Sequence, residues 1–173
     1  MSARFYLMKY PKWFRFYLMG LAVLLCWLLM QPCLYIAAGR SLLAVIPAPS
    51  GMPFSIHFIH SVQKTPVEEN LTVNDRQDGF VLQSTKYQSF GVGLPFLASD
   101  GNFHEEGNYF VMDHMNRKFS QLSLRPGVGT QLTILAAGTS YRLYEQLPLG
   151  TKVDLYMAPY YKQWVGKVDK HGK

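Results

Sequence analysis

Hydrophobic and polar residues follow two different patterns along this chain. One continuous apolar run covers residues 16–38 and contains no charged side chain. Beyond residue 53, apolar and polar side chains alternate in short runs with a period of two, which is the pattern of a half-buried β-strand. Turn-forming clusters separate these runs, and none of them is long enough to predict a helix. The pattern therefore predicts one N-terminal helix followed by an all-β domain.

About eight strands are expected in that domain. Their number and spacing suit a small β-sandwich or a barrel-like domain, and the sequence does not choose between the two. The expected strands are Phe54–Val62, Val67–Val73, Phe80–Tyr87, Asn108–Asp113, Phe119–Leu124, Gln131–Ala136, Tyr141–Glu145 and Lys152–Ala158.

The apolar run is long enough for one transmembrane helix, because an α-helix rises 1.5 Å per residue and the hydrocarbon core is roughly 30 Å thick. It is preceded by the basic residues Arg4, Lys9, Lys12 and Arg15. Such a flank holds the N-terminus in the cytoplasm, so the rest of the chain is expected outside a bacterial inner membrane. The alternative is a cleavable signal peptide, because Ala37, Ala38 and Gly39 form a weak cleavage site.

These patterns divide the chain into five parts. They are a cytoplasmic basic N-terminus at 1–15, a transmembrane anchor at 16–38, a linker at 39–52, a periplasmic β-domain at 53–159 and a basic tail at 160–173. The C-terminal part is rich in aromatic residues that suit either a lipid surface, a membrane partner or packing between strands. These residues are Tyr141, Tyr144, Tyr156, Tyr160, Tyr161 and Trp164.

Charge and cysteine content exclude several classes of function. The formal net charge is +6, but the excess lies at the two ends, and residues 40–159 contain nine basic against ten acidic residues. A nucleic-acid partner is therefore not expected. Cys26 and Cys33 both lie in the apolar run, so the β-domain has no disulfide and no cysteine ligand for zinc. We expect no metal and no cofactor.

The segment from His60 to Glu69 carries the densest set of polar groups. Alternation places both residues on the apolar faces of successive strands, joined by a turn near Lys64 to Pro66. Such a hairpin can bring imidazole and carboxylate together as a general base requires, with the Ser61 hydroxyl nearby. However, His60 and Ser61 fall on opposite faces, which argues against a serine–histidine nucleophile. A buried polar pair that fixes strand register, a binding site and a catalytic site all stay open.

Two other polar segments are weaker candidates. The loop Gly91-Val92-Gly93-Leu94-Pro95 permits close backbone approach, but it lacks the third glycine of a dinucleotide site and the lysine of a P-loop. It is either a tight loop packed on the core or a set of exposed amides that bind a ligand or partner. The residues His104–Glu106 and Asp113–Arg117 offer oxygen and nitrogen ligands, but their spacing matches no metal motif, so we expect solvated turns.

The order of these motifs resembles a known family. His60-Ser61-Val62, then Pro66-Val67-Glu68-Glu69, then Gly91 to Pro95, behind one hydrophobic N-terminus, is similar to the bacterial domain of unknown function 1850, over roughly Pro53 to Ala158. Members of that family are often encoded beside TAXI-type tripartite ATP-independent periplasmic (TRAP) transporters, so the resemblance implies an accessory to solute uptake. The motif positions that it marks as functional or shape-determining are His60, Ser61, Glu69, Gly91, Gly93 and Pro95.

We therefore expect a membrane-anchored periplasmic accessory protein, and not an enzyme. Its N-terminal helix would contact the lipid bilayer, and the His60 to Glu69 hairpin with the Gly91 to Pro95 loop would bind a TRAP permease or solute receptor. One span cannot form a translocation path, so the chain would assist transport. The alternative is a small periplasmic ligand-binding protein or enzyme that uses His60 and Glu69, and a structural envelope protein is the third interpretation.

Overall fold

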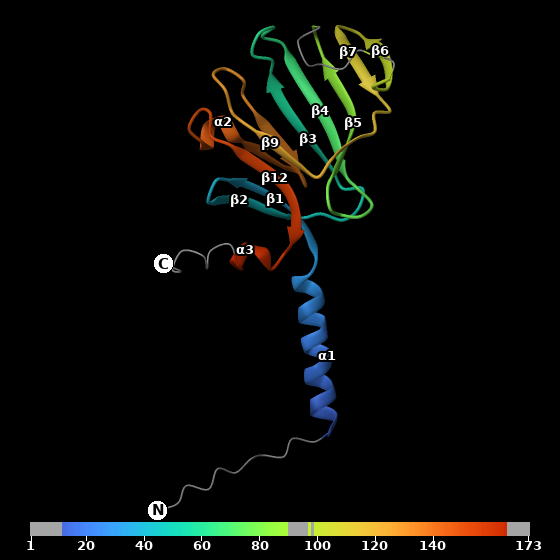
Figure 1. Cartoon of the computed structure of the whole chain (residues 1–173), viewed down its shortest axis with the longest axis vertical. Helices are drawn as coiled ribbons and strands as arrows, with labels where there is room; N and C mark the ends of the chain where they lie inside the picture. The colour runs from blue at the N-terminus through green and yellow to red at the C-terminus, as the bar shows by residue number, and fades with distance from the viewer. Residues whose placement is uncertain (1–11, 90–96, 98, 166–173) are drawn as a thin grey trace, which may run out of the picture.

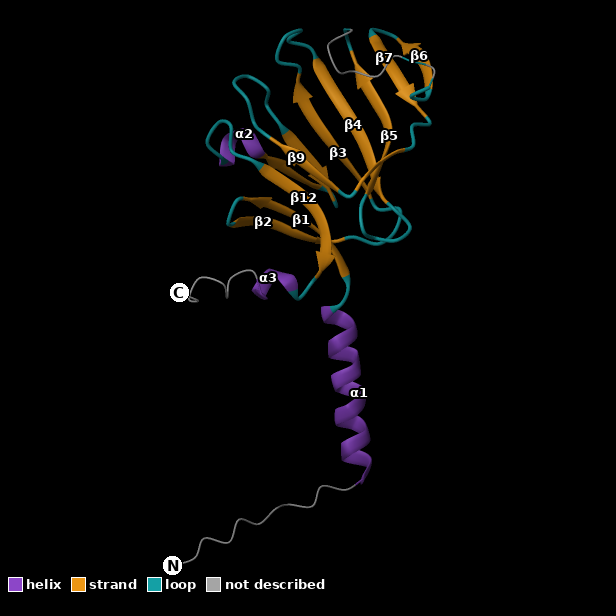
Figure 2. Ribbon diagram, in the orientation of Figure 1, coloured by secondary structure: helices purple, strands orange, loops and turns teal. Residues whose placement is uncertain are grey.

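The computed structural model describes residues 12–89, 97 and 99–165, and most of them lie in β-strands (Figure 1, Figure 2). The strands form two antiparallel sheets. The small sheet has the order β2-β1-β12-β9, with β1 at Pro32–Ala38, β2 at Ser41–Pro47, β9 at Gln121–Leu124 and β12 at Val153–Pro159.

The large sheet has the order β11-β10-β3-β4-β5-β7-β6. The eighth strand, β8, pairs with the first half of β5, and β7 pairs with the second half of β5. Its strands are β3 (Pro53–Ile59), β4 (Pro66–Val73), β5 (Phe80–Tyr87), β6 (Asn102–Glu106), β7 (Tyr109–Asp113), β8 (Arg117–Phe119), β10 (Thr133–Ala136) and β11 (Thr139–Arg142). Three helices complete the described chain, namely α1 (Lys12–Leu29), α2 (Leu143–Gln146) and α3 (Lys162–Val165).

The two sheets share one apolar core. Leu34 and Ile36 of β1 and Leu155 of β12 reach it from the small sheet, and Ile56 of β3 and Ile134 of β10 reach it from the large sheet. All five side chains are almost completely buried. Each comes from a strand whose alternate residues point the other way, as a half-buried sheet requires. The mostly-β prediction is confirmed, and the strands form two antiparallel sheets of four and eight strands.

The expectation of one helix across residues 16–38 is wrong in its second half. α1 ends at Leu29, and residues 32–38 form β1, which lies between β2 and β12. Pro32 explains the break, because the residue before a proline is disfavoured in helical conformation. The error arises because a continuous apolar run fits a buried strand as well as a helix.

The linker expected at residues 39–52 is also wrong, because Ser41–Pro47 forms β2. Gly39 turns the chain between β1 and β2 with a φ of +58°, a conformation that favours glycine. The apolar core therefore begins with β1, well before the expected domain start at residue 53.

The other strand predictions agree with the structure, with three exceptions and two omissions. The strand Phe54–Val62 was expected to continue to Val62, but β3 ends at Ile59. The run Phe119–Leu124 was expected as one strand, but Phe119 ends β8 and β9 begins at Gln121. The run Tyr141–Glu145 was expected as a strand, but β11 ends at Arg142 and α2 begins at Leu143. β6 gave no alternation to detect, because all five of its side chains are exposed. β8 has only three residues and is too short for a periodic pattern.

The first helix stands apart from both sheets. α1 extends from the base of the β-domain, beside the start of β1 (Figure 1). Its large apolar side chains are exposed along its whole length, from Trp13 through Leu21 and Val23 to Trp27 and Leu28. In the described ranges, no helix combines the length and the apolar character that crossing a membrane requires.

Candidate functional site

The structure separates His60 from Glu69. Glu69 of β4 lies opposite Ile56 on one side and Thr85 on the other, and both of these neighbours are buried. Its side chain therefore points to the inner face of the large sheet, as the alternation predicted. The last paired residues of the hairpin are Ile59 and Pro66, so His60 lies in the loop beyond the strands. The expected His60–Glu69 pair is wrong.

His60 organises the loop that joins β3 to β4. Its Nδ1 accepts hydrogen bonds from the backbone N–H groups of Val62, at 3.3 Å, and Gln63, at 3.2 Å. Its backbone N–H donates to the carbonyl of Thr65 at 2.8 Å. Ser61 is exposed in the same loop. The contacts of His60 are those of a side chain that fixes a turn.

Glu69 is a partly buried carboxyl in an apolar row. Burial raises the pKa of Glu69 from its ordinary value of 4.5, and the positive charge of Arg117 opposes this rise. No hydrogen bond joins its carboxylate to another residue within the described chain. Glu69 therefore has the environment of a carboxyl that resists ionisation. The remaining predicted site residues, Gly91, Gly93 and Pro95, lie outside the described residues.

The structure brings together a different histidine and a different glutamate. His57 lies opposite Glu68 in the β3–β4 pair, with 3.9 Å between Nε2 and Oε2. Both side chains point to the outer face of the large sheet, away from the core residue Ile56. Ser55 Oγ lies 2.9 Å from His57 Nε2, and Asn70 Nδ2 donates to Glu68 Oε1 at 2.9 Å. We call Ser55, His57, Glu68 and Asn70 the polar row.

The polar row does not have the geometry of a catalytic triad. In a triad, one ring nitrogen of the histidine faces the hydroxyl and the other faces the carboxylate. Here His57 Nε2 faces both Ser55 Oγ and Glu68 Oε2. One nitrogen cannot accept a proton from the hydroxyl and donate one to the carboxylate at the same time. The row is suited to hydrogen bonding with a bound group.

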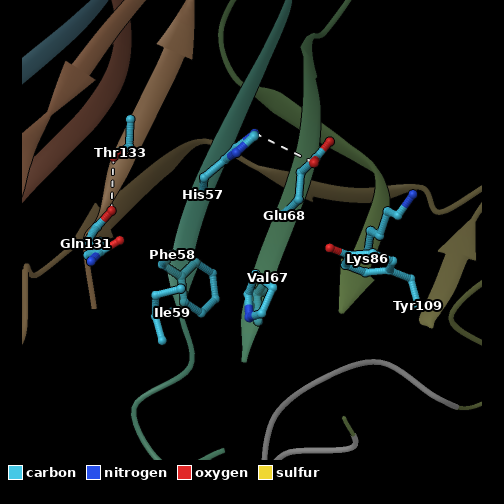
Figure 3. Close-up of a pocket in the computed structure, with 10 residues that line it drawn as sticks. His57, Phe58, Ile59, Val67, Glu68, Lys86, Tyr109, Gln131 and Thr133 are labelled. Atoms are coloured by element: carbon cyan, nitrogen blue, oxygen red, sulfur yellow. Dashed lines mark hydrogen bonds and ion pairs between the residues drawn. The ribbon is translucent and has the colours of Figure 1, made fainter. Parts of the chain in front are cut away.

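A pocket of about 490 Å³ opens beside the polar row (Figure 3). His57 and Glu68 lie on one side of it and Lys86 of β5 lies on another, next to Tyr109 (Figure 3). Apolar and neutral polar side chains complete its lining. These are Phe58, Ile59, Pro66, Val67, Gln131 and Thr133.

Lys86 is held in place by its neighbours. Its Nζ donates to Glu106 Oε2 at 2.8 Å and lies 4.8 Å from the centre of the Tyr109 ring. The hydrogen bond raises the pKa of Lys86 and lowers the pKa of Glu106. Each shift favours the charged form, so the pocket presents an ammonium group beside the carboxylate of Glu68.

A second hollow, of about 510 Å³, lies on the same face of the large sheet. Ser55 and Asn70 line it, together with Leu135 of β10 and Thr139 of β11. Because His57 and Glu68 line the first pocket, the polar row forms the boundary between the two hollows. The outer face thus has two hollows with a row of hydrogen-bonding side chains between them.

His104–Glu106 and Asp113–Arg117 were expected in solvated turns, and this is wrong in part. His104–Glu106 lie in β6, Asp113 is the last residue of β7, and Met115 is buried in the core. The side chains of His104 and His114 are accessible. Asp113 Oδ1 lies 2.7 Å from His114 Nδ1, and Oδ2 lies 3.7 Å from His104 Nδ1. Among the residues that the structure describes, no three or more His, Cys, Asp or Glu side chains are arranged to hold a metal ion.

Residues 54–143, more than half of the chain, match the protein family described as "Domain of unknown function (DUF1850)". The chain belongs to this family. The DUF1850 match starts within β3, as the resemblance implied, but ends at Leu143 and so leaves out β12. It contains the polar row and the first pocket entirely. Searches of curated proteins and of solved structures found no match.

The sequence pattern contained a signal for the polar row. Because alternation places His60 and Glu69 on the apolar faces of two successive strands, it also places His57 and Glu68 on the opposite, polar faces of those strands. The turn was expected too close to Pro66, which left the pairing of the hairpin undetermined. In the structure Ile59 faces Pro66, and this register sets His57 opposite Glu68. A residue on the solvent face of a strand is usually unremarkable, so its pairing partner was needed to single it out.

Proposed function

We propose that this DUF1850 protein is a membrane-anchored periplasmic interaction module. In this proposal α1 is embedded in the inner membrane with the N-terminus on the cytoplasmic side. The outer face of the large sheet binds a segment of a partner protein. The observation that carries the proposal is the combination of an uncovered apolar helix with a hollowed polar face on a folded β-domain.

The exposed side chains of α1 support anchoring. A helix that is apolar all round is stable where lipid or protein covers it. Eighteen residues rise about 27 Å, slightly less than the roughly 30 Å hydrocarbon core, and a bilayer thins locally around a short helix. Trp13 and Trp27 near its two ends suit the two interfaces.

The position of β1 supports retention of the anchor. Cleavage near Ala38 or Gly39 would remove β1, which contributes Leu34 and Ile36 to the core and pairs with both β2 and β12. Loss of one buried leucine or isoleucine side chain typically destabilises a protein by 2–5 kcal/mol. A cleaved product would therefore lose the centre of its small sheet.

The outer face of the large sheet supports binding to a protein segment. Its two hollows are open, lie side by side and present both charge signs next to apolar groups such as Ile59 and Pro66. An extended segment can lie across both hollows and hydrogen-bond to the polar row between them. His57 and Glu68 have side-chain exposures of 40% and 39%, so both are accessible to it.

The partner we propose is a TAXI-type TRAP transporter, through its permease or its solute receptor. This choice follows from the family resemblance, whereas the binding face follows from the geometry. A small-molecule ligand is the second candidate, because the first pocket has a volume within the range of ligand sites. That ligand would contact His57 and Glu68, because neither His60 nor Glu69 lines the pocket.

Affinity isolation of the full chain from native membranes in mild detergent tests the proposal. We expect a TRAP permease or receptor to co-purify, and the double variant His57→Ala/Glu68→Ala to lose it. The matched control is Lys152→Ala/Asp154→Ala, which removes another ion pair, at β12 of the small sheet and away from the outer face of the large sheet. Isolation of the intact chain without a transporter component, or equal recovery with both double variants, would contradict the proposal.

A further inference from the structure

We propose that the C-terminal segment from Pro159 to Trp164 lies in the headgroup region of the bilayer and fixes the orientation of the β-domain above it. This inference rests on the proposed anchoring by α1 and goes beyond it. A helix joined to a domain by a free linker would allow the domain any orientation. The contacts around this segment remove that freedom.

Backbone hydrogen bonds tie the segment to the end of α1. The N–H of Tyr160 donates to the carbonyl of Gln31 at 2.9 Å, and the N–H of Tyr161 donates to the carbonyl of Leu29 at 3.0 Å. The carbonyl of Leu29 belongs to the last turn of the helix, where such groups lack partners within the helix. The segment therefore caps α1 and lies where α1 meets β1 (Figure 2).

The other side of the segment is fixed to the small sheet. The hydroxyl of Tyr35, a buried residue of β1, donates to the carbonyl of Pro159 at 2.8 Å and lies 3.1 Å from the carbonyl of Tyr160. The Tyr35 ring stacks on Tyr156 of β12 with centres 5.3 Å apart. Helix end, segment and small sheet are thus joined by directional contacts on both sides.

The exposed side chains of the segment have the chemistry of a membrane interface. Tyr160 is 37% exposed and Trp164 is 50% exposed, and their rings meet edge to face at 5.2 Å. Trp27, at the same end of α1, is 60% exposed. Tyrosine and tryptophan are enriched at the level of the headgroups, where one end of the side chain is in lipid and the other in water.

Charge complements these aromatic residues. Lys162 is exposed in α3, and the sequence from residue 160 onward contains four lysines against one aspartate. Basic segments beside a membrane helix are attracted to anionic lipid headgroups. A lipid surface therefore accounts for the aromatic residues of the segment and for the excess of lysine in the sequence from residue 160 onward.

The arrangement has a consequence for the candidate binding face. The segment and α1 meet at the small-sheet end of the domain, whereas the loop between β3 and β4 lies at the far end of the large sheet (Figure 1). If the segment lies on the bilayer, that loop points away from it. The pocket at the neighbouring end of β3 and β4 is then open to the periplasm.

Depth-dependent quenching of Trp164 tests the inference in the full chain. The variant Trp13→Phe/Trp27→Phe leaves Trp164 as its only tryptophan. It is placed in liposomes that contain both zwitterionic and anionic lipids. The lipid acyl chains carry bromine either close to the headgroups or close to the ends of the acyl chains. We expect the bromines close to the headgroups to quench most of the Trp164 fluorescence and the bromines at the acyl-chain ends to quench little of it. The control carries Val62→Trp and Trp164→Phe in the same background, in the exposed β3–β4 loop, and should keep its fluorescence.

Liposome flotation separates the two ways in which the inference can fail. If the chain floats with the liposomes but Trp164 is not quenched, the segment does not lie in the headgroup region, while anchoring by α1 still holds. A chain that does not float overturns both. If Trp164 is shielded from an aqueous quencher only after a transporter component is added, this surface binds a protein partner. That result also contradicts the placement of the segment in the headgroup region.

Discussion

His57 and Glu68 face each other across β3 and β4, with Nε2 and Oε2 3.9 Å apart on the outer face of the large sheet. The next residue along β4, Glu69, points to the opposite face and contributes no group to the pocket. Two adjacent glutamates thus have different environments, one beside the first pocket and one beside the core.

Removing the outer pair should affect binding more than folding. Since both side chains are only half-buried and lie on the outer face of the sheet, the double variant His57→Ala/Glu68→Ala should change the free energy of unfolding by no more than about 0.5 kcal/mol. Urea denaturation of the full chain in detergent measures this change. A much larger loss of stability would show that the pair holds the sheet together, and the co-purification result would then need a different explanation.

His60 should stabilise the β3–β4 loop through its side-chain hydrogen-bond acceptor, and another side chain with an acceptor should replace it in part. His60→Ala removes the group that accepts from the N–H groups of Val62 and Gln63 and should destabilise the domain by about 1 kcal/mol. His60→Asn supplies an acceptor on a shorter side chain and should restore part of the loss. Hydrogen exchange of these two amides is the readout. Protection that is the same in all three proteins would rule out the capping role.

Glu69 should make the protein less stable as the pH rises. Its pKa is raised in the folded state, so the folded protein binds more protons than the unfolded chain at pH values above 4.5 and below the raised value. The free energy of unfolding therefore falls with increasing pH across this window. Glu69→Gln should remove that fall and stabilise the protein at neutral pH by about 1 kcal/mol.

Denaturation measured at several pH values tests this expectation. Glu105→Gln is the matched control for the loss of one carboxylate, because Glu105 lies in the fully exposed strand β6. If Glu69→Gln and Glu105→Gln change the pH dependence equally, the buried environment of Glu69 has no energetic effect.

Tyr35 should hold the C-terminal segment through its hydroxyl. Burial raises the pKa of Tyr35 to about 12, so the hydroxyl is protonated and can donate to the carbonyl of Pro159 throughout the physiological range. Tyr35→Phe should destabilise the protein by about 1–2 kcal/mol and increase hydrogen exchange at Tyr160 and Tyr161. Tyr156→Phe retains the ring stack and the Tyr35 hydroxyl, so these amides should stay protected in it.

The strands of the large sheet were predictable because each buries one face. β3, β4 and β5 show a clear alternation, and the inward position of Glu69 followed from it directly. β1 was not recognised, because it is buried between two other strands and its sequence is therefore continuously apolar. Such a sequence cannot be told from a continuation of the preceding apolar helix. Its assignment required β12, which is more than one hundred residues away in the sequence.

The candidate site was predictable only in its location. The sequence pointed to the hairpin that contains His60 and Glu69, and the polar row lies on that hairpin. The identity of the interacting side chains depends on register, and an error of one residue moves a side chain to the other face of the sheet. The pocket also requires Lys86, Tyr109 and Thr133 from three other strands, whose order in the sheet is a tertiary property.

Site-specific photo-crosslinking in native membranes tests the central claim most directly. A photoreactive amino acid replaces Thr133, which lines the pocket, or Lys152, an exposed residue next to β12 of the small sheet, in the otherwise intact chain. The interaction-module account predicts a crosslink from position 133 to a TRAP permease or solute receptor, identified by mass spectrometry, and none from position 152. Equal crosslinking from both positions, or crosslinks from position 133 that contain no transporter component, would contradict it.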